Sequence, residues 1–81
     1  MQEYIATFHT HLSAMRTQRA LANAGVQARL APVPRYLSAS CGTCVFFFAE
    51  APCLELMDHD VERVVVRLSA PGPFEELLYH R

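Results

Sequence analysis

The sequence has little of what a membrane protein or a nucleic-acid-binding protein needs. Its formal net charge is −1, so a basic surface that neutralises phosphates is not expected. No apolar run approaches the ~20 residues that cross a bilayer. Glu3 stands where a secretory signal peptide carries basic residues. These absences predict a cytoplasmic protein that has neither a nucleic acid nor a membrane as a partner.

Cysteines are few and odd in number. Three cysteines argue against a secreted disulfide framework, which pairs an even number of them. In a reducing compartment they are thiols that fill the core, bind metal or react. The sequence therefore directs attention to the individual surroundings of each thiol.

The pattern of apolar residues predicts an α+β domain. Alternating or β-branched runs indicate strands, and Thr10 and Gly25 are typical of the start and the end of a helix. On that helix Met15 shares a face with Ala14 and Leu21, and that face is expected to pack inward. The expected elements are strands at 4–8, 26–30, 43–48 and 64–68, helices at 10–24 and 52–60, and a last short helix at 74–79.

This order is the ferredoxin-like plan, βαββαβ: a four-stranded antiparallel sheet with helices on one face. We expect a single domain of residues 1–70 and a helical C-terminal tail of residues 71–81. A chain of 81 residues buries only about 60–65% of its unfolded surface. The other face of the sheet would be open to water, and monomers rarely expose large apolar patches. A homodimer is therefore predicted, with the tail folding over the open face as the rival.

The loop from Pro34 to Gly42 has the composition of a functional segment. Gly42 lets the backbone approach a ligand or take a positive φ, and Arg35 adds a fixed positive charge. Ser38 and Ser40 add hydroxyl donors, and successive N–H groups in such a turn can hold an anion. The same field favours a thiolate at Cys41, which makes that sulfur a candidate nucleophile. The alternative is a Cys41 that packs without reacting.

The spacing of Cys41 and Cys44 is formally that of a CxxC motif, which can be a redox or a metal motif. A zinc site needs four ligands, and a redox motif belongs at the start of a helix, whereas this one leads into a strand. Cys44 is therefore expected in the core, and Cys53 is interpreted as a small apolar filler. We expect no metal and no cofactor.

Histidines and acids offer two further clusters. His9 and His11 lie at a strand-to-helix junction, where either could act as a base for Cys41 or bind metal. The sequence favours two solvated residues that flank the capping Thr10. Residues 58–60, Asp-His-Asp, resemble a ligand triplet, but a polar turn is the preferred interpretation.

Residues 4–48 resemble a known family. The segment runs from Tyr4 to Phe48 and contains the pair Pro34-Arg35, followed by a hydrophobic and serine-rich stretch that ends in Cys41-Gly42. In these features the chain is similar to the small bacterial selenium/sulfur carrier protein-like family. The resemblance implies that Cys41 is the atom-carrying thiol, with Arg35, Ser38 and Ser40 around it. Ala39 stands where a serine is common, so one hydroxyl donor of the family pattern is missing.

Two functions remain from the sequence. In the first, Cys41 accepts sulfur or selenium from a donor protein and relays it to an acceptor protein, as a carrier rather than a turnover enzyme. In the second, the loop from Pro34 to Gly42 binds a small anion in a regulatory or interaction module, and Cys41 only packs.

Overall fold

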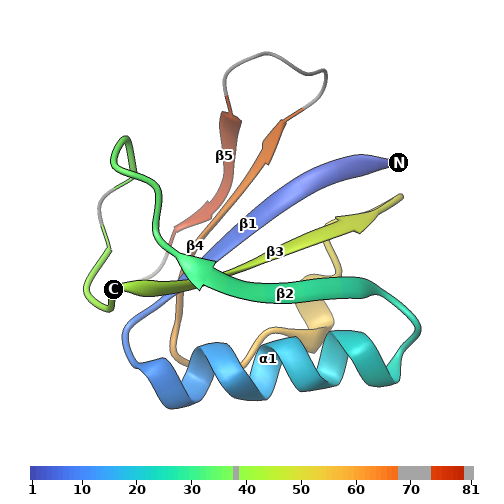
Figure 1. Ribbon diagram of the computed structural model, residues 1–81. Helices are drawn as coiled ribbons and strands as arrows, with labels where there is room; N and C mark the ends of the chain where they lie inside the picture. Colours follow the sequence, from blue (N-terminus) through green and yellow to red (C-terminus); the bar gives the residue numbers. More distant parts are fainter. Residues whose placement is uncertain (38, 68–73, 80–81) are drawn as a thin grey trace.

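In the part of the chain that the structure describes, a single antiparallel sheet carries one α-helix against one face (Figure 1). The computed structural model describes residues 1–37, 39–67 and 74–79. The sheet order is β2-β3-β1-β4-β5, and each neighbouring pair is antiparallel. The elements are β1 (Gln2–Phe8), α1 (His11–Asn23), β2 (Gln27–Pro32), β3 (Thr43–Ala49), a 3-10 turn η1 (Leu54–Leu56), β4 (Val61–Arg67) and β5 (Phe74–Tyr79). The predicted α+β class is confirmed.

Helix α1 begins and ends where the local signals predict. The hydroxyl oxygen of Thr10 accepts a hydrogen bond from the Ser13 N–H at 3.2 Å, which satisfies one of the free donors of the first turn. Gly25 follows the helix with φ +84, a conformation that side-chain-bearing residues rarely adopt. The chain then turns directly into β2.

The buried face of α1 is rotated from the predicted one. Met15 is 39% exposed, whereas the polar residues Ser13 and Thr17 are fully buried. Ser13 Oγ donates to the Asp58 carboxylate at 2.8 Å, and Thr17 Oγ1 accepts from the Asp58 N–H at 2.9 Å. These two hydroxyls are buried because they tie the helix to the turn before β4, a contact that apolar periodicity does not reveal.

The main core lies between the sheet and α1. Tyr4 of β1 and Phe47 of β3 are buried, and their rings stack with centroids 5.0 Å apart. Leu21 of α1 and Phe8 complete the centre of this core. Burial of one such side chain contributes about 1.5–3 kcal/mol, so this layer is the principal source of stability.

The predicted second helix is wrong. Only a 3-10 turn, η1, lies between β3 and β4. Cys53 precedes it with φ 55, a left-handed conformation that interrupts a right-handed helix, and Met57 after it is extended. Leu56 and Met57 still pack against the core beside α1. Within the described residues, the fold is therefore not the two-helix ferredoxin-like plan.

The predicted C-terminal helix is also wrong, because residues 74–79 form strand β5. This strand pairs with β4 from Phe74 opposite Arg67 to Tyr79 opposite Arg63. An isolated helix of six residues is marginal in water. Pairing with β4 instead satisfies backbone N–H and C=O groups of both strands, so tertiary context decides the conformation. Residues 71–73, 80 and 81 of the predicted tail lie outside the described residues.

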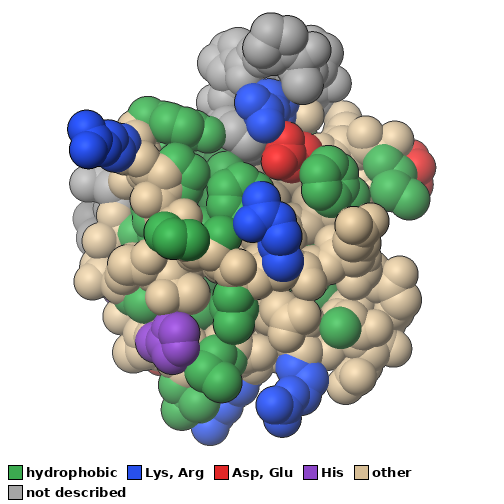
Figure 2. Space-filling model, in the orientation of Figure 1, with side chains coloured by type: hydrophobic (Ala, Val, Ile, Leu, Met, Phe, Trp, Pro, Cys, Tyr) green, Lys and Arg blue, Asp and Glu red, His purple; other side chains and the backbone are tan. Residues whose placement is uncertain are grey.

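The second face of the sheet is covered in part by the loop that follows β2. Ile5, Cys44 and Val65 are buried on this face, and Val33 and Leu37 of the loop pack against them. The face also carries charged groups, since Arg67 pairs with Glu3 and the Arg29 guanidinium lies over the Phe46 ring at 4.6 Å. In the view of Figure 2, basic side chains stand among hydrophobic ones. Of the helices within the described ranges, none has the length and apolarity to cross a membrane.

Candidate functional site

The two ends of the loop between β2 and β3 are joined by a backbone hydrogen bond. The Val33 N–H donates to the Gly42 carbonyl at 3.1 Å, which closes the base of the loop, and the Leu37 N–H donates to the Pro34 carbonyl at 3.0 Å. Leu37 is packed on the second face of the sheet. Cys41 therefore lies next to the hydrogen-bonded foot of the loop, beside the start of β3.

Cys41 is half-buried and contacts the first residue of β3. The Thr43 N–H donates to Cys41 Sγ at 3.4 Å, and Sγ lies 3.8 Å from the Thr43 carbonyl oxygen. Thr43 Oγ1 lies 3.0 Å from Nδ1 of His11, the first residue of α1. A sulfur anion readily accepts a hydrogen bond from a backbone N–H. The Thr43 N–H can therefore stabilise negative charge on Cys41 Sγ. The His11 imidazole contacts the same threonine and is thus linked to Cys41 through Thr43.

Ser40, on the other side of Cys41, is held by an acid from β4. Glu62 is 13% exposed and accepts twice from Ser40: from the N–H at 3.1 Å and from Oγ at 3.0 Å. His9 Nδ1 lies 3.2 Å from the same Oγ. Because the single hydroxyl proton of Ser40 points to Glu62, Nδ1 of His9 is the donor in its contact. His9 Nε2 is buried and has no partner among the described residues. The residue that follows β1, a residue of β4 and the loop therefore meet beside Cys41.

His9 contacts the loop and His11 contacts the first residue of β3, which corrects the interpretation of the two histidines as merely solvated. His9 bonds with Ser40 and His11 bonds with Thr43, so the two imidazoles lie on either side of the Cys41 segment. Thr10 between them caps the helix as predicted. Sequence reasoning missed Glu62 altogether. Its only signal is an acid within an apolar strand, and its place beside His9 depends on the pairing of β1 with β4.

The other residues predicted to surround Cys41 have fewer observed contacts with its site. Arg35 is exposed, and its side chain makes no ion pair or hydrogen bond with another described residue. Gly42 has no positive φ, so of its two predicted roles only the close approach of backbone to a ligand stays a prediction. Ser38 lies outside the described residues. The roles of Arg35 and Ser38 around Cys41 also stay predictions.

The other two thiols have different surroundings. Cys44 is fully buried, its Sγ donates to the Pro32 carbonyl at 3.7 Å, and burial raises its pKa to about 11. Cys53 Sγ donates to the Ala51 carbonyl at 3.4 Å, and burial likewise raises its pKa. The predictions that Cys44 is a core residue and that Cys53 packs as a filler are confirmed. The CxxC spacing therefore does not present two accessible thiols.

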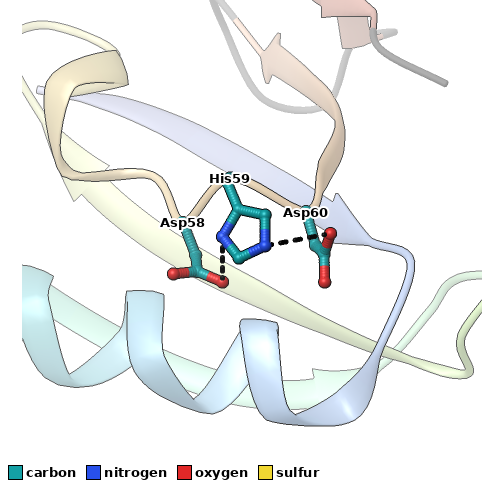
Figure 3. Close-up of side chains that lie close together, drawn as sticks. All are labelled: Asp58, His59 and Asp60. Atoms are coloured by element: carbon teal, nitrogen blue, oxygen red, sulfur yellow. Dashed lines mark ion pairs between the residues drawn. The ribbon is translucent and has the colours of Figure 1, made fainter.

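Residues 58–60 form a polar turn, as preferred from the sequence (Figure 3). His59 is exposed and lies between two carboxylates, with Nδ1 at 3.6 Å from Asp58 Oδ2 and Nε2 at 3.5 Å from Asp60 Oδ1. The candidate ligand atoms lie within 4.8 Å of one another. The Asp58 carboxylate already accepts from Ser13 of α1. Its evident role is to fix the start of β4 against the helix.

Comparison with known proteins gives a family. Residues 3–59 match the family described as "Putative Se/S carrier protein-like". The chain is also 35% identical over 46 residues to the "Uncharacterized protein YtiA" of Escherichia coli (strain K12). That match covers 57% of this chain and 54% of the relative, about half the length of each. No solved structure matches. Because the family match spans more than half of the chain and includes the Cys41 loop, the protein belongs to the Se/S carrier protein-like family.

Proposed function

We propose that Cys41 accepts a sulfur or selenium atom from a donor protein and passes it to an acceptor protein. The observation that carries the proposal is the hydrogen bond from the Thr43 N–H to Cys41 Sγ. Of the three thiols, Cys41 is the one that combines partial exposure with a backbone donor directed at its sulfur among the described residues. The family description supports the same chemistry.

Loading is a thiol exchange reaction that needs no external oxidant. The Cys41 thiolate attacks the outer sulfur of a donor persulfide, and a bond forms between Cys41 Sγ and that sulfur. The S–S bond of the donor breaks, and its electron pair leaves with the donor thiolate. Unloading is the reverse step with an acceptor nucleophile, and Cys41 then leaves as a thiolate. Selenium follows the same balance with an outer selenium atom.

The surrounding residues suit a carrier. The Thr43 N–H faces the sulfur that becomes negative when the outer atom departs. Glu62 holds Ser40, and with it the chain next to Cys41. Burial and the raised pKa keep Cys44 from attacking a loaded Cys41, a reaction that would release hydrosulfide and leave a disulfide. A free carrier thiol needs a reducing compartment, so we also propose a cytoplasmic location.

The small-anion alternative is weaker on physical grounds. The Ser40 N–H and hydroxyl that an anion would use already donate to the Glu62 carboxylate. A second anion there would have to displace that carboxylate and meet its negative charge. Arg35 alone remains as an exposed cation of the loop.

Homodimer formation stays a prediction. Leu30 and Phe48 are each 38% exposed, but they lie on opposite faces of the sheet, so they do not form one apolar face. The sheet edge at β2 is one surface that could pair with a second copy. Sedimentation at micromolar concentration decides between monomer and dimer.

Loading can be tested with the reduced protein and inorganic polysulfide as the sulfur donor. We expect an increase of about 32 Da, mapped to the Cys41 peptide and removed by a small thiol acceptor. Cys41→Ser should abolish the adduct, and Cys53→Ser, the matched control, should retain it. A stable adduct on Cys53, or an adduct that no thiol removes, would contradict the proposal.

A further inference from the structure

An apolar groove runs along the exposed side of α1. It is lined by Leu12, Met15, Arg16, Arg19, Ala20 and Asn23. These positions recur every three or four residues and so share one face of the helix. Leu12 is 54% exposed and Met15 is 39% exposed, although both are large hydrophobic residues. Leu12 and Met15 are neighbours on this face, and contiguous exposed apolar side chains of this kind are typical of interaction surfaces.

The groove is positively charged. From Tyr4 to Ala49 the sequence has four arginines and no acid, and two of these arginines are Arg16 and Arg19 of the groove. Neither arginine forms an ion pair with any residue that the structure describes. Along the bottom of Figure 2, where α1 lies in Figure 1, hydrophobic side chains stand beside basic ones. A molecule that fits this groove therefore combines an apolar surface with negative charge.

The groove is continuous with the surroundings of Cys41. Leu12 follows His11, whose Nδ1 lies 3.0 Å from Thr43 Oγ1, and the Thr43 N–H donates to Cys41 Sγ. A helix rises about 1.5 Å per residue, so the groove leads away from the thiol over about 17 Å. A protein segment that lies along α1 ends beside Cys41.

We propose that this groove is the docking surface for the protein that exchanges sulfur or selenium with Cys41, and that this partner presents an amphipathic helix with acidic side chains along its apolar face. The partner's apolar residues cover Leu12 and Met15, and its carboxylates pair with Arg16 and Arg19. The identification of the occupant as an exchange partner rests on the proposed function. The description of the groove, of its charge and of its position does not depend on that proposal.

The docking surface can be tested with two labelled helical peptides and the full-length protein. Both peptides carry leucines at the same positions, and one has glutamates where the other has lysines. Fluorescence anisotropy should show that the glutamate peptide binds more tightly and that added salt weakens it. In the double variant Arg16→Gln/Arg19→Gln its affinity should fall roughly fivefold, as expected for two exposed ion pairs. The control is Arg29→Gln on β2, which removes one arginine charge at a position outside the groove. It should change the affinity less than about twofold.

The outcomes separate docking from chemistry. Cys41→Ser should bind the glutamate peptide as the wild type does, so a failure of sulfur loading leaves the docking result interpretable. The double variant should still react with iodoacetamide at Cys41 at the wild-type rate, which shows that its site is folded. Equal binding of the two peptides, or an unchanged affinity in the double variant, would overturn the proposal. Tighter binding of a single-stranded oligonucleotide that is lost in the double variant would also overturn it, because the groove would then be a nucleic-acid surface.

Discussion

Reaction with iodoacetamide should distinguish the three thiols of the native protein, with Cys44 the slowest. Burial raises the pKa of Cys44 from 9.0 to about 11. Two pKa units lower the thiolate fraction at pH 8 about a hundredfold relative to an ordinary cysteine. Because the thiolate is the nucleophile, the labelling rate falls by the same factor. Full burial of the side chain slows the reaction further.

The measurement compares native and unfolded protein. Isotopically distinct iodoacetamide is added before and after denaturation, and mass spectrometry of the three cysteine peptides gives each rate. For Cys44 the rate in denaturant should exceed the native rate at least about a hundredfold. Cys41 should be the fastest native thiol, because it is half-buried and the Thr43 N–H is directed at its sulfur. Cys53 should fall between them, since burial also raises its pKa.

The assignment of roles depends on this order. If native Cys44 labels within about tenfold of its unfolded rate, its burial is not effective in solution and it could resolve a loaded Cys41. If Cys53 labels before Cys41, the surroundings of Cys41 do not favour reaction. Either result would refute the reasoning that makes Cys41 the carrier thiol.

Three other perturbations test the fold around the site. The folded-state pKa of Cys44 is raised, so the contribution of this thiol to stability is present below pH 9 and is lost as the pH rises to about 11. Urea unfolding should therefore show that the free energy of unfolding falls by up to about 3 kcal/mol over this pH range. The variant Cys44→Ala should lack this fall. Glu62→Gln should lower the free energy of unfolding by about 1–2 kcal/mol, because it weakens two charge-assisted hydrogen bonds with Ser40, and about half of that loss should remain when Ser40→Ala is already present, since Ser40→Ala removes the hydroxyl donor and keeps the backbone N–H donor. Gly25→Ala should cost about 1 kcal/mol or more because φ is +84, whereas Gly42→Ala should be nearly neutral, since a Cβ there meets nothing within 4 Å; equal costs in thermal unfolding would contradict the backbone argument.

Local signals predicted the elements that local chemistry decides. Thr10 and Gly25 marked the ends of α1, and the apolar run beginning at Thr43 marked β3. Cys44 was assigned to the core because it falls within that run. Each of these predictions depends on neighbours a few residues apart along the chain, so periodicity and capping rules were sufficient.

The errors occur where distant strands decide the structure. Residues 74–79 pair with β4, and residues 54–56 form only a short turn after the left-handed Cys53. Glu62 reaches Ser40 because β4 lies beside β1, a register that the sequence does not show. The sequence placed the candidate site at Cys41 and named His9 and His11 as groups that could act on it, although it favoured solvated side chains for both. Glu62 was not named, because its place beside Ser40 depends on the pairing of strands.

If Cys41 carries sulfur or selenium in the cell, the protein purified from cells should retain part of this cargo, and its mass shows whether it does. The protein is isolated without reductant, its intact mass is measured, and the Cys41 peptide is sequenced by mass spectrometry. We expect a fraction with an added mass of about 32 Da for sulfur or about 79 Da for selenium on Cys41, absent after reduction and absent in Cys41→Ser. An unmodified Cys41 in all preparations, with any such adduct on Cys44 or Cys53 instead, would contradict it.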